Sequence, residues 1–265
     1  MKLWVLFKES LRYVLRSRLL VLLLVFSFLL HYVGLSIVKN TFFSEQGLIA
    51  AVGPRQGMFV SLYLSLFMGV FLAVIYGVWM VPYLHQGERS LLTFVLPVTK
   101  WSHPLVYFFT FLILFLLECL ILVGSFGWVF GKEVLLQPRF SWSALFFCLV
   151  LVGLVGEFLL FCSAVLSLVI GQLSTIFVMA GAFISMQVLG TLFRFGLDQY
   201  AQDQGGKLLT TYQIYRYLPP LGELIFTLKQ TYSQGLFPTH QFFSWLVWLF
   251  ILILLFRWVI RYPRT

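Results

Sequence analysis

The chain has 265 residues, of which 61% are hydrophobic and only 10% are charged. A soluble domain carries about 25% charged residues, so this composition excludes a soluble globular protein, a disordered chain, a disulfide scaffold and a collagen-like fibre. A polytopic membrane protein remains. The net charge of +9 then bears on orientation in the membrane, and nucleic-acid binding is not expected.

Residues 1–18 are expected to form an amphipathic helix in the membrane interface, with basic groups near the lipid headgroups. Lys8, Arg12 and Arg16 follow one another at intervals of four on one face. A basic N-terminus that only sets the orientation is the alternative. The neighbouring face carries, at helical spacing, Trp4, Phe7, Leu11, Val14 and Leu15.

Residues 19–265 are expected to form an all-α domain of six transmembrane helices. A bilayer core needs about 20 apolar residues as a helix, and the apolar runs lack the alternation of barrel strands. Gly171 begins the expected turn between the fourth and fifth spans. The expected spans are 19–38, 57–84, 103–130, 142–170, 175–193 and 241–260.

The second span carries a stripe of small residues at intervals of four. Small residues let helix backbones approach closely, and lipid supplies no hydrophobic force for helix association. The stripe therefore predicts a tight helix contact, within the chain or across a dimer, unless the spacing arises by chance. Its members are Ser61, Ser65, Gly69, Ala73 and Gly77.

The loop 85–102 is charged, then apolar, and Pro97 interrupts it. Residues 88–96 can form about two helical turns, which Pro97 would end. Leu91, Leu92 and Val95 would share an apolar face. This face predicts docking of a cytoplasmic partner, and a helix lying on the membrane surface is the alternative.

Two acids lie near the middles of the third and fourth spans, Glu118 and Glu157. A carboxyl group inside a membrane is expensive and is a functional hypothesis by default. At similar depth on adjacent helices, the two groups could share a proton or line a substrate path. The alternative is a pair of neutral acids, each hydrogen-bonded within the bundle.

Lysine and arginine set the expected topology. They dominate before the first span and after the last, so both termini are expected on the cytoplasmic side. The protein itself is expected in the inner membrane of the cell. Segment 194–240 is then external. Pro219-Pro220 separates two short pieces, Leu208–Tyr217 and Leu221–Leu228, and because the second contains Ile225 and Phe226, interfacial or re-entrant helices are expected there.

Several chemical motifs are absent from the sequence. There is no phosphate loop, no His-Glu-x-x-His and no Gly-x-Ser-x-Gly, so no catalytic residue, metal or cofactor is expected in this chain. The cysteines form no Cys-x-x-Cys motif. Cys119, Cys148 and Cys162 all fall within spans and are interpreted as packing residues.

The order of these elements resembles the permease subunit of a type-2 ABC exporter. The likeness covers nearly the whole chain: a basic amphipathic elbow, six spans with both ends inside, a docking loop and a proline-interrupted external segment. Its most specific part is the loop, where Leu91-Leu92 and Pro97-Val98-Thr99-Lys100 match the family in kind. The family's Gly-Thr pair is missing, and Arg89-Ser90 stands near its place.

The resemblance implies a second permease chain, in a homodimer or heterodimer, and a separate ATP-binding subunit that holds ATP and Mg²⁺. The loop would be the coupling helix, and substrate would cross between the two permeases. The aromatic-rich spans suit an amphiphilic or lipid-like substrate. The residues that match the ATPase contact are Glu88, Arg89, Leu91, Leu92, Pro97 and Lys100, the last at the entrance of the third span.

Two other classes of function stay open. One is a membrane scaffold or anchor subunit without transport, which the docking loop would also suit. The other is an intramembrane enzyme using Glu118 and Glu157, for which the sequence offers no evident nucleophile or metal set.

Overall fold

A computed structural model shows a bundle of long helices, with no strand among the described residues. The loop 85–102 lies outside the described part, apart from Ser102, as do residues 201–221 of segment 194–240. The structure describes residues 2–43, 52–80, 102–136, 141–200, 222, 224–235 and 237–259.

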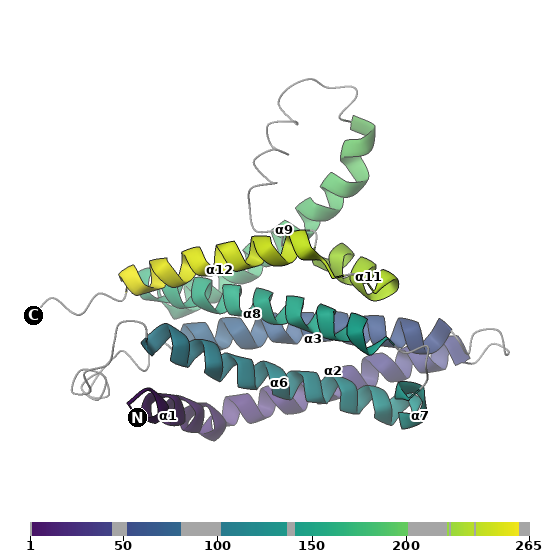
Figure 1. Cartoon of the computed structure of the whole chain (residues 1–265), viewed down its shortest axis with the longest axis horizontal. Helices are drawn as coiled ribbons and strands as arrows, with labels where there is room; N and C mark the ends of the chain where they lie inside the picture. Colours follow the sequence, from purple (N-terminus) through teal and green to yellow (C-terminus); the bar gives the residue numbers. More distant parts are fainter. Residues whose placement is uncertain are drawn as a thin grey trace, which may run out of the picture.

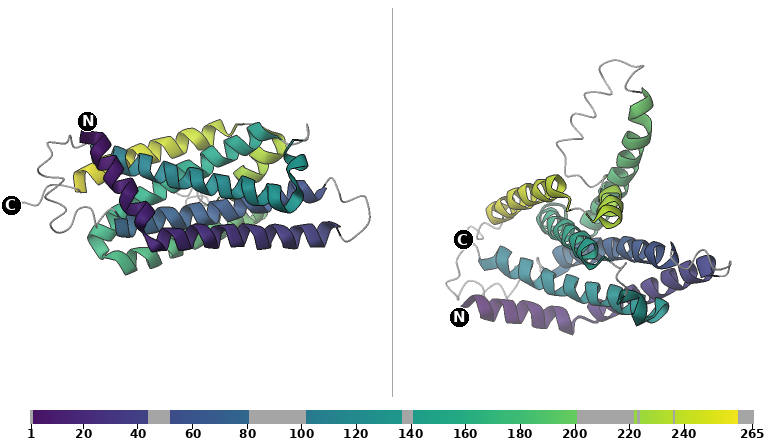
Figure 2. Two further views of the ribbon diagram at one scale, coloured as in Figure 1. Left: turned by 90° about the horizontal axis from the view of Figure 1, so that it is seen from below. Right: turned by 45° about the vertical axis from the view of Figure 1, so that its right-hand side comes forward.

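The chain begins with two helices of different character. Helix α1, Lys2–Arg16, is amphipathic, whereas α2, Arg18–Phe43, is apolar along most of its length. Ser17 separates them, and α1 leaves the axis of α2 at an angle (Figure 2). Val14 of α1 is buried against the bundle, whereas Trp4 is 67% exposed. The structure thus contains the helix expected at residues 1–18, with one face on the bundle.

The remaining helices include five that overlap expected spans, together with the short helices α7 and α11. Gly171, at φ 85°, separates α8 from α9, a backbone conformation that glycine adopts without steric cost. The helices are α3 (Val52–Ile75), continued by the π-helical turn η1 (Tyr76–Met80), α6 (Ser102–Phe130), α7 (Lys132–Leu135), α8 (Trp142–Ile170), α9 (Gln172–Tyr200), α11 (Leu224–Gln234) and α12 (Thr239–Val259).

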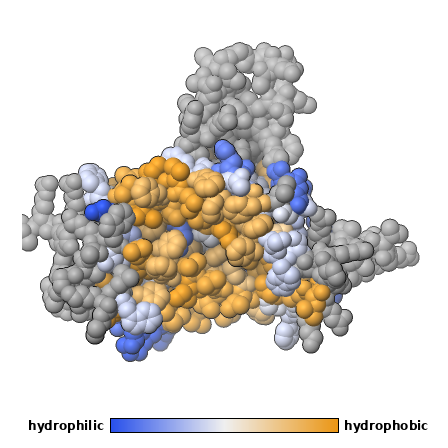
Figure 3. Space-filling view, viewed as in Figure 1, coloured by the Kyte–Doolittle hydropathy of each residue, from blue (hydrophilic) through white to orange (hydrophobic). Residues whose placement is uncertain are grey.

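Five helices in the described part are long and apolar enough to cross a membrane. They mark the chain as a multi-pass membrane protein, and an apolar surface covers the middle of the bundle (Figure 3). The apolar part of α9 is shorter, so six spans stay a prediction. The five are Arg18–Asn40, Gln56–Trp79, Ser102–Phe130, Trp142–Ile170 and Thr239–Trp258.

The directions of the helices are readable in Figure 1. Helix α1, the end of η1, the start of α6 and the end of α12 lie at one end of the bundle. Helix α7 lies at the other end, and α12 begins about midway along the bundle, next to α11. Helices α8 and α12 run in the same direction side by side, so the chain between them returns across the length of the bundle.

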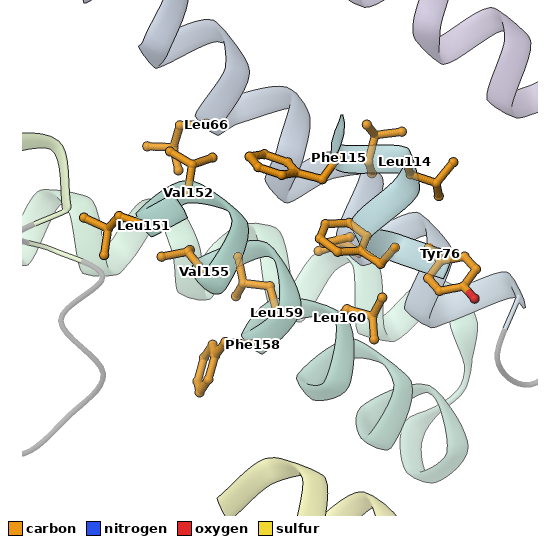
Figure 4. Packing of buried hydrophobic residues seen from close by; sticks show 14 of the residues in the cluster. Leu66, Tyr76, Leu114, Phe115, Leu151, Val152, Val155, Phe158, Leu159 and Leu160 are labelled. Carbon is orange, nitrogen blue, oxygen red and sulfur yellow. The ribbon is translucent and has the colours of Figure 1, made fainter. Parts of the chain in front are cut away.

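Helices α3 and α8 form the centre of the bundle. Helix α3 contacts α2, α6 and α8, and α8 also contacts α11 and α12. Leu66 of α3, Phe115 of α6 and Val152 of α8 meet in this core (Figure 4). Gly156 of α8 lies against Phe111, whose ring a Cβ at that position would approach within 2.7 Å. Large aromatic rings beside small residues hold these helices close together.

Candidate functional site

Glu118 lies in a fully buried polar cluster between α2, α3 and α6. Its side chain has no solvent exposure. The Ser27 hydroxyl of α2 donates to this carboxyl group, with Oγ 2.8 and 2.7 Å from the two oxygens. A buried carboxyl group needs such partners, because desolvation without them is costly. The contact ties α6 to α2 in the middle of both helices.

His31 of α2 completes the cluster and bridges to α3. Its Nδ1 lies 2.9 Å from the carbonyl oxygen of Ser27, and its Nε2 lies 3.1 Å from Oγ of Ser65. The same Nε2 is 3.8 Å from Oε1 of Glu118. A carbonyl only accepts hydrogen bonds, so Nδ1 carries the proton in the neutral ring. Nε2 then carries the only lone pair of the ring, which accepts from the Ser65 hydroxyl, and this nitrogen lies beside the acid.

The order of these groups differs from a Ser-His-acid catalytic triad. In a triad the nucleophile and the acid bind opposite ring nitrogens of the histidine. Here Ser65 and Glu118 both approach Nε2, and Nδ1 is occupied by a backbone carbonyl. All of these side chains are also buried. The cluster therefore does not have the geometry of such a triad.

Glu157 lies apart from this cluster, on α8. Its side chain is 3% exposed, and neither carboxyl oxygen has a hydrogen-bond partner among the residues that the structure describes. No hydrogen bond therefore joins it to Glu118. The sequence allowed a proton shared between the two acids, and the structure does not contain that pair, because Glu118 is bonded to α2 instead.

The small-residue stripe lies inside the chain, and all five members are buried. Gly69 packs against Phe115 and Val152, and a Cβ at this glycine would lie 3.6 Å from each of those side chains. Gly77 approaches α8 so closely that a Cβ would lie 2.5 Å from the backbone oxygen of Leu160. The sequence allowed a helix contact within the chain or across a dimer. In the structure the stripe packs against helices of the same chain.

A second buried polar cluster connects α1 to the bundle. Ser10 Oγ lies 3.1 Å from the Tyr76 hydroxyl and 3.2 Å from Oγ1 of Thr110. Tyr76 is the first residue of η1, the turn that ends α3. The amphipathic helix is thus held by hydrogen bonds at the end of the bundle from which segment 81–101 leaves and to which it returns.

The other predicted site residues have simpler outcomes. Cys148 donates a weak hydrogen bond from Sγ to the carbonyl of Leu228, 3.6 Å away, and all three cysteines are free. Within the described ranges, no three His, Cys, Asp or Glu side chains gather to hold a metal ion. The predicted ATPase contacts lie outside the described residues: Glu88, Arg89, Leu91, Leu92, Pro97 and Lys100.

Sequence reasoning singled out Glu118 but missed two of its partners, Ser27 and His31. A signal was present, since the two residues are four apart in the first span and so share a helix face. That face also needed a partner inside the membrane. The sequence marks Ser65 only as a small residue, and it assigns no role to the hydroxyl.

Comparison with known proteins finds no matching family model and no matching curated protein.

The two acids are expected to respond oppositely to replacement by leucine. Glu157→Leu should raise stability by about 1–3 kcal/mol, because it removes a buried carboxyl group without a hydrogen bond. Glu118→Leu should lower stability by a similar amount, because Ser27 and His31 lose their partner. Thermal unfolding of the purified variants in one detergent measures both. A loss of stability in Glu157→Leu would show that Glu157 has a stabilising partner.

Proposed function

We propose that this chain is the permease subunit of an ABC exporter that moves an amphiphilic or lipid-like substrate across the inner membrane. A separate ATP-binding subunit hydrolyses ATP, and a second permease chain completes the path. The observation that carries the proposal is the arrangement at one end of the bundle. There the amphipathic α1 lies beside the end of η1 and the start of α6, between which the sequence holds the docking loop.

The basic charge at this end supports a cytoplasmic position. Lys8, Arg12 and Arg16 of α1 are polar and positively charged, and Arg257 lies in the last turn of α12 at the same end. The positive-inside rule then puts both termini and the docking loop in the cytoplasm. A coupling helix belongs on that side, because ATP is there.

The chain direction supports six crossings. Helices α8 and α12 run the same way, so a sixth crossing between them gives each neighbouring pair of spans opposite directions. Helix α9 begins at the end where α8 stops, and its apolar stretch Gln172–Val188 is the segment available for this crossing. Helix α11 lies in the expected external segment and packs on α8 through Leu224 and Leu228.

Glu118 and Glu157 are the polar groups that we assign to the translocation path. Both are buried in the bundle, and Glu157 has no hydrogen-bond partner among the described residues, so it is available to a polar group of a substrate. The path between two permease chains would have to reach them by a rearrangement of the helices, as alternating access requires.

Affinity purification of the tagged full-length chain from its native membrane tests the proposal. The expected result is co-purification of a protein with a phosphate-binding loop, in about equal amount, with ATPase activity in the complex. The control is an unrelated multi-pass membrane protein carrying the same tag. Isolation of the intact chain without any ATP-binding protein would contradict the exporter function and favour a scaffold or anchor subunit.

A further inference from the structure

We propose that the Ser27–His31–Ser65–Glu118 cluster is a proton-binding site, at which one proton exchanges between the Glu118 carboxyl group and Nε2 of His31. This inference goes beyond transport of an amphiphilic substrate and does not depend on it. It assigns a ligand, the proton, to residues from three helices that lie in the middle of the membrane.

Charge balance favours a cluster with one exchangeable proton, shared between Glu118 and His31. With one exchangeable proton, the pair is either a neutral acid beside a neutral imidazole or a carboxylate beside an imidazolium, and its net charge is zero. Loss of that proton leaves a net negative charge, and gain of a second leaves a net positive charge. Both are expensive in a buried site, where side chains of His31 and Glu118 have no solvent exposure.

The hydrogen bonds give the proton a defined route. Nδ1 of His31 donates its proton to the Ser27 carbonyl, 2.9 Å away, so the lone pair of the ring is on Nε2, which accepts from Oγ of Ser65, 3.1 Å away. That lone pair is 3.8 Å from Oε1 of Glu118. Transfer requires the Ser65 hydroxyl to turn its hydrogen away from Nε2; the acid O–H bond then breaks, an Nε2–H bond forms, and the carboxylate that results accepts the Ser27 hydrogen bond. A shift of under about 1 Å brings the two atoms within hydrogen-bond distance.

The neighbouring groups are suited to this exchange. Helix α2 contributes His31, and α6 contributes Glu118 and, next to it in sequence, the thiol of Cys119. Helix α3 contributes hydroxyl groups, those of Ser65 and, one turn away, Ser61. The Ser61 hydroxyl is buried and has no hydrogen-bond partner among the described residues. An unpartnered hydroxyl beside the cluster offers a place for a water molecule that carries the proton in or out.

A small cavity lies near the cluster on the side of the amphipathic helix. Its volume is about 20 Å³, and most of the side chains that line it are apolar. Leu23 and Leu114 line it, and each lies one turn before a cluster residue, Ser27 or Glu118. Tyr76, from the second polar cluster, lines it as well. The cavity therefore borders Tyr76 of the second polar cluster and lies one helical turn from the first.

Infrared difference spectroscopy of the full-length protein in lipid nanodiscs tests the proposal without any ATP-binding subunit. Glu157→Gln serves as the background, so that Glu118 is the remaining acid in the middle of a described span. We expect a carboxylic-acid carbonyl band that disappears in Glu118→Gln, shifts in Ser27→Ala and moves on transfer to D₂O. His31→Gln should slow that deuterium exchange about tenfold or more, because the accepting base is lost.

A second measurement uses the wild-type chain, so its result does not depend on whether the variants fold. Nitrogen-15 spectra of labelled histidine report the protonation of each ring nitrogen, and the exposed His240 serves as the internal reference. We expect Nδ1 of His31 to stay protonated. The protonation of Nε2 and the carboxylic-acid band of Glu118 should change together. A carbonyl band that does not exchange in D₂O, or a His31 signal that stays constant while the Glu118 band changes, would overturn the proposal. These results leave the exporter function untouched, since neither measurement uses transport.

Discussion

Replacing Gly77 with leucine is expected to prevent the chain from folding, whereas the same change at Gly124 is expected to be tolerated. A Cβ at Gly77 would lie 2.5 Å from the backbone oxygen of Leu160 and 3.1 Å from the backbone nitrogen of Ala164. Backbone atoms of α8 cannot move aside as a side chain can. The overpacking should cost at least about 3 kcal/mol, enough to open the contact between η1 and α8.

Gly124 is the matched control for this prediction. It also lies in the interior of a long apolar helix, α6, but a Cβ there meets no atom within 4 Å among the described residues. Leucine is favoured over glycine in a helix by about 1 kcal/mol. The yield of monodisperse protein in detergent and its thermal midpoint measure both variants. Equal behaviour of Gly77→Leu and Gly124→Leu would show that the η1–α8 contact is not tight.

Replacing Leu92 with aspartate is expected to abolish binding of the ATP-binding subunit. Leu92 belongs to the predicted apolar face of the docking loop, and a charge on a buried interface anchor is left without a partner. We expect a loss of at least about a hundredfold in affinity, which corresponds to about 3 kcal/mol. Co-purification and the ATPase activity of the isolated complex provide the measurement.

Leu136→Asp is the matched control, because it makes the same change at the opposite end of the bundle. Leu136 follows α7 and is 80% exposed, so a charge there costs little. Both variants should reach the membrane at wild-type level, which separates loss of binding from loss of folding. Undiminished recovery of the ATP-binding subunit with Leu92→Asp would remove the coupling role of the loop.

Much of the fold could be predicted from the sequence because single helices in a membrane follow local rules. Apolar length places the spans, and the basic repeat at Lys8, Arg12 and Arg16 separates α1 from α2. The glycine at the α8–α9 turn was predicted from the need to divide one long apolar run. The span count rests on the same argument from apolar length. That argument does not decide whether α9 is a span, because its apolar stretch, Gln172–Val188, is short.

The partners of the buried polar groups could not be predicted in this way. Glu118 and Glu157 look alike in the sequence, since each is an isolated acid in an apolar run. Which of them finds a partner depends on the rotation of α6 and α8 and on which helices they face. Glu118 faces Ser27 and His31, whereas neither carboxyl oxygen of Glu157 has a hydrogen-bond partner among the described residues.

The sequence by itself determined that this is an all-helical, multi-pass membrane protein, because the length and composition of each span are local properties. It also predicted a close helix contact along the stripe from Ser61 to Gly77. Only the tertiary structure decided that this contact lies within the chain and that Glu118 joins His31 instead of Glu157. The physical reason is that a hydrogen bond in the membrane needs atoms about 3 Å apart, and only the packing of α2, α3 and α6 brings those atoms together.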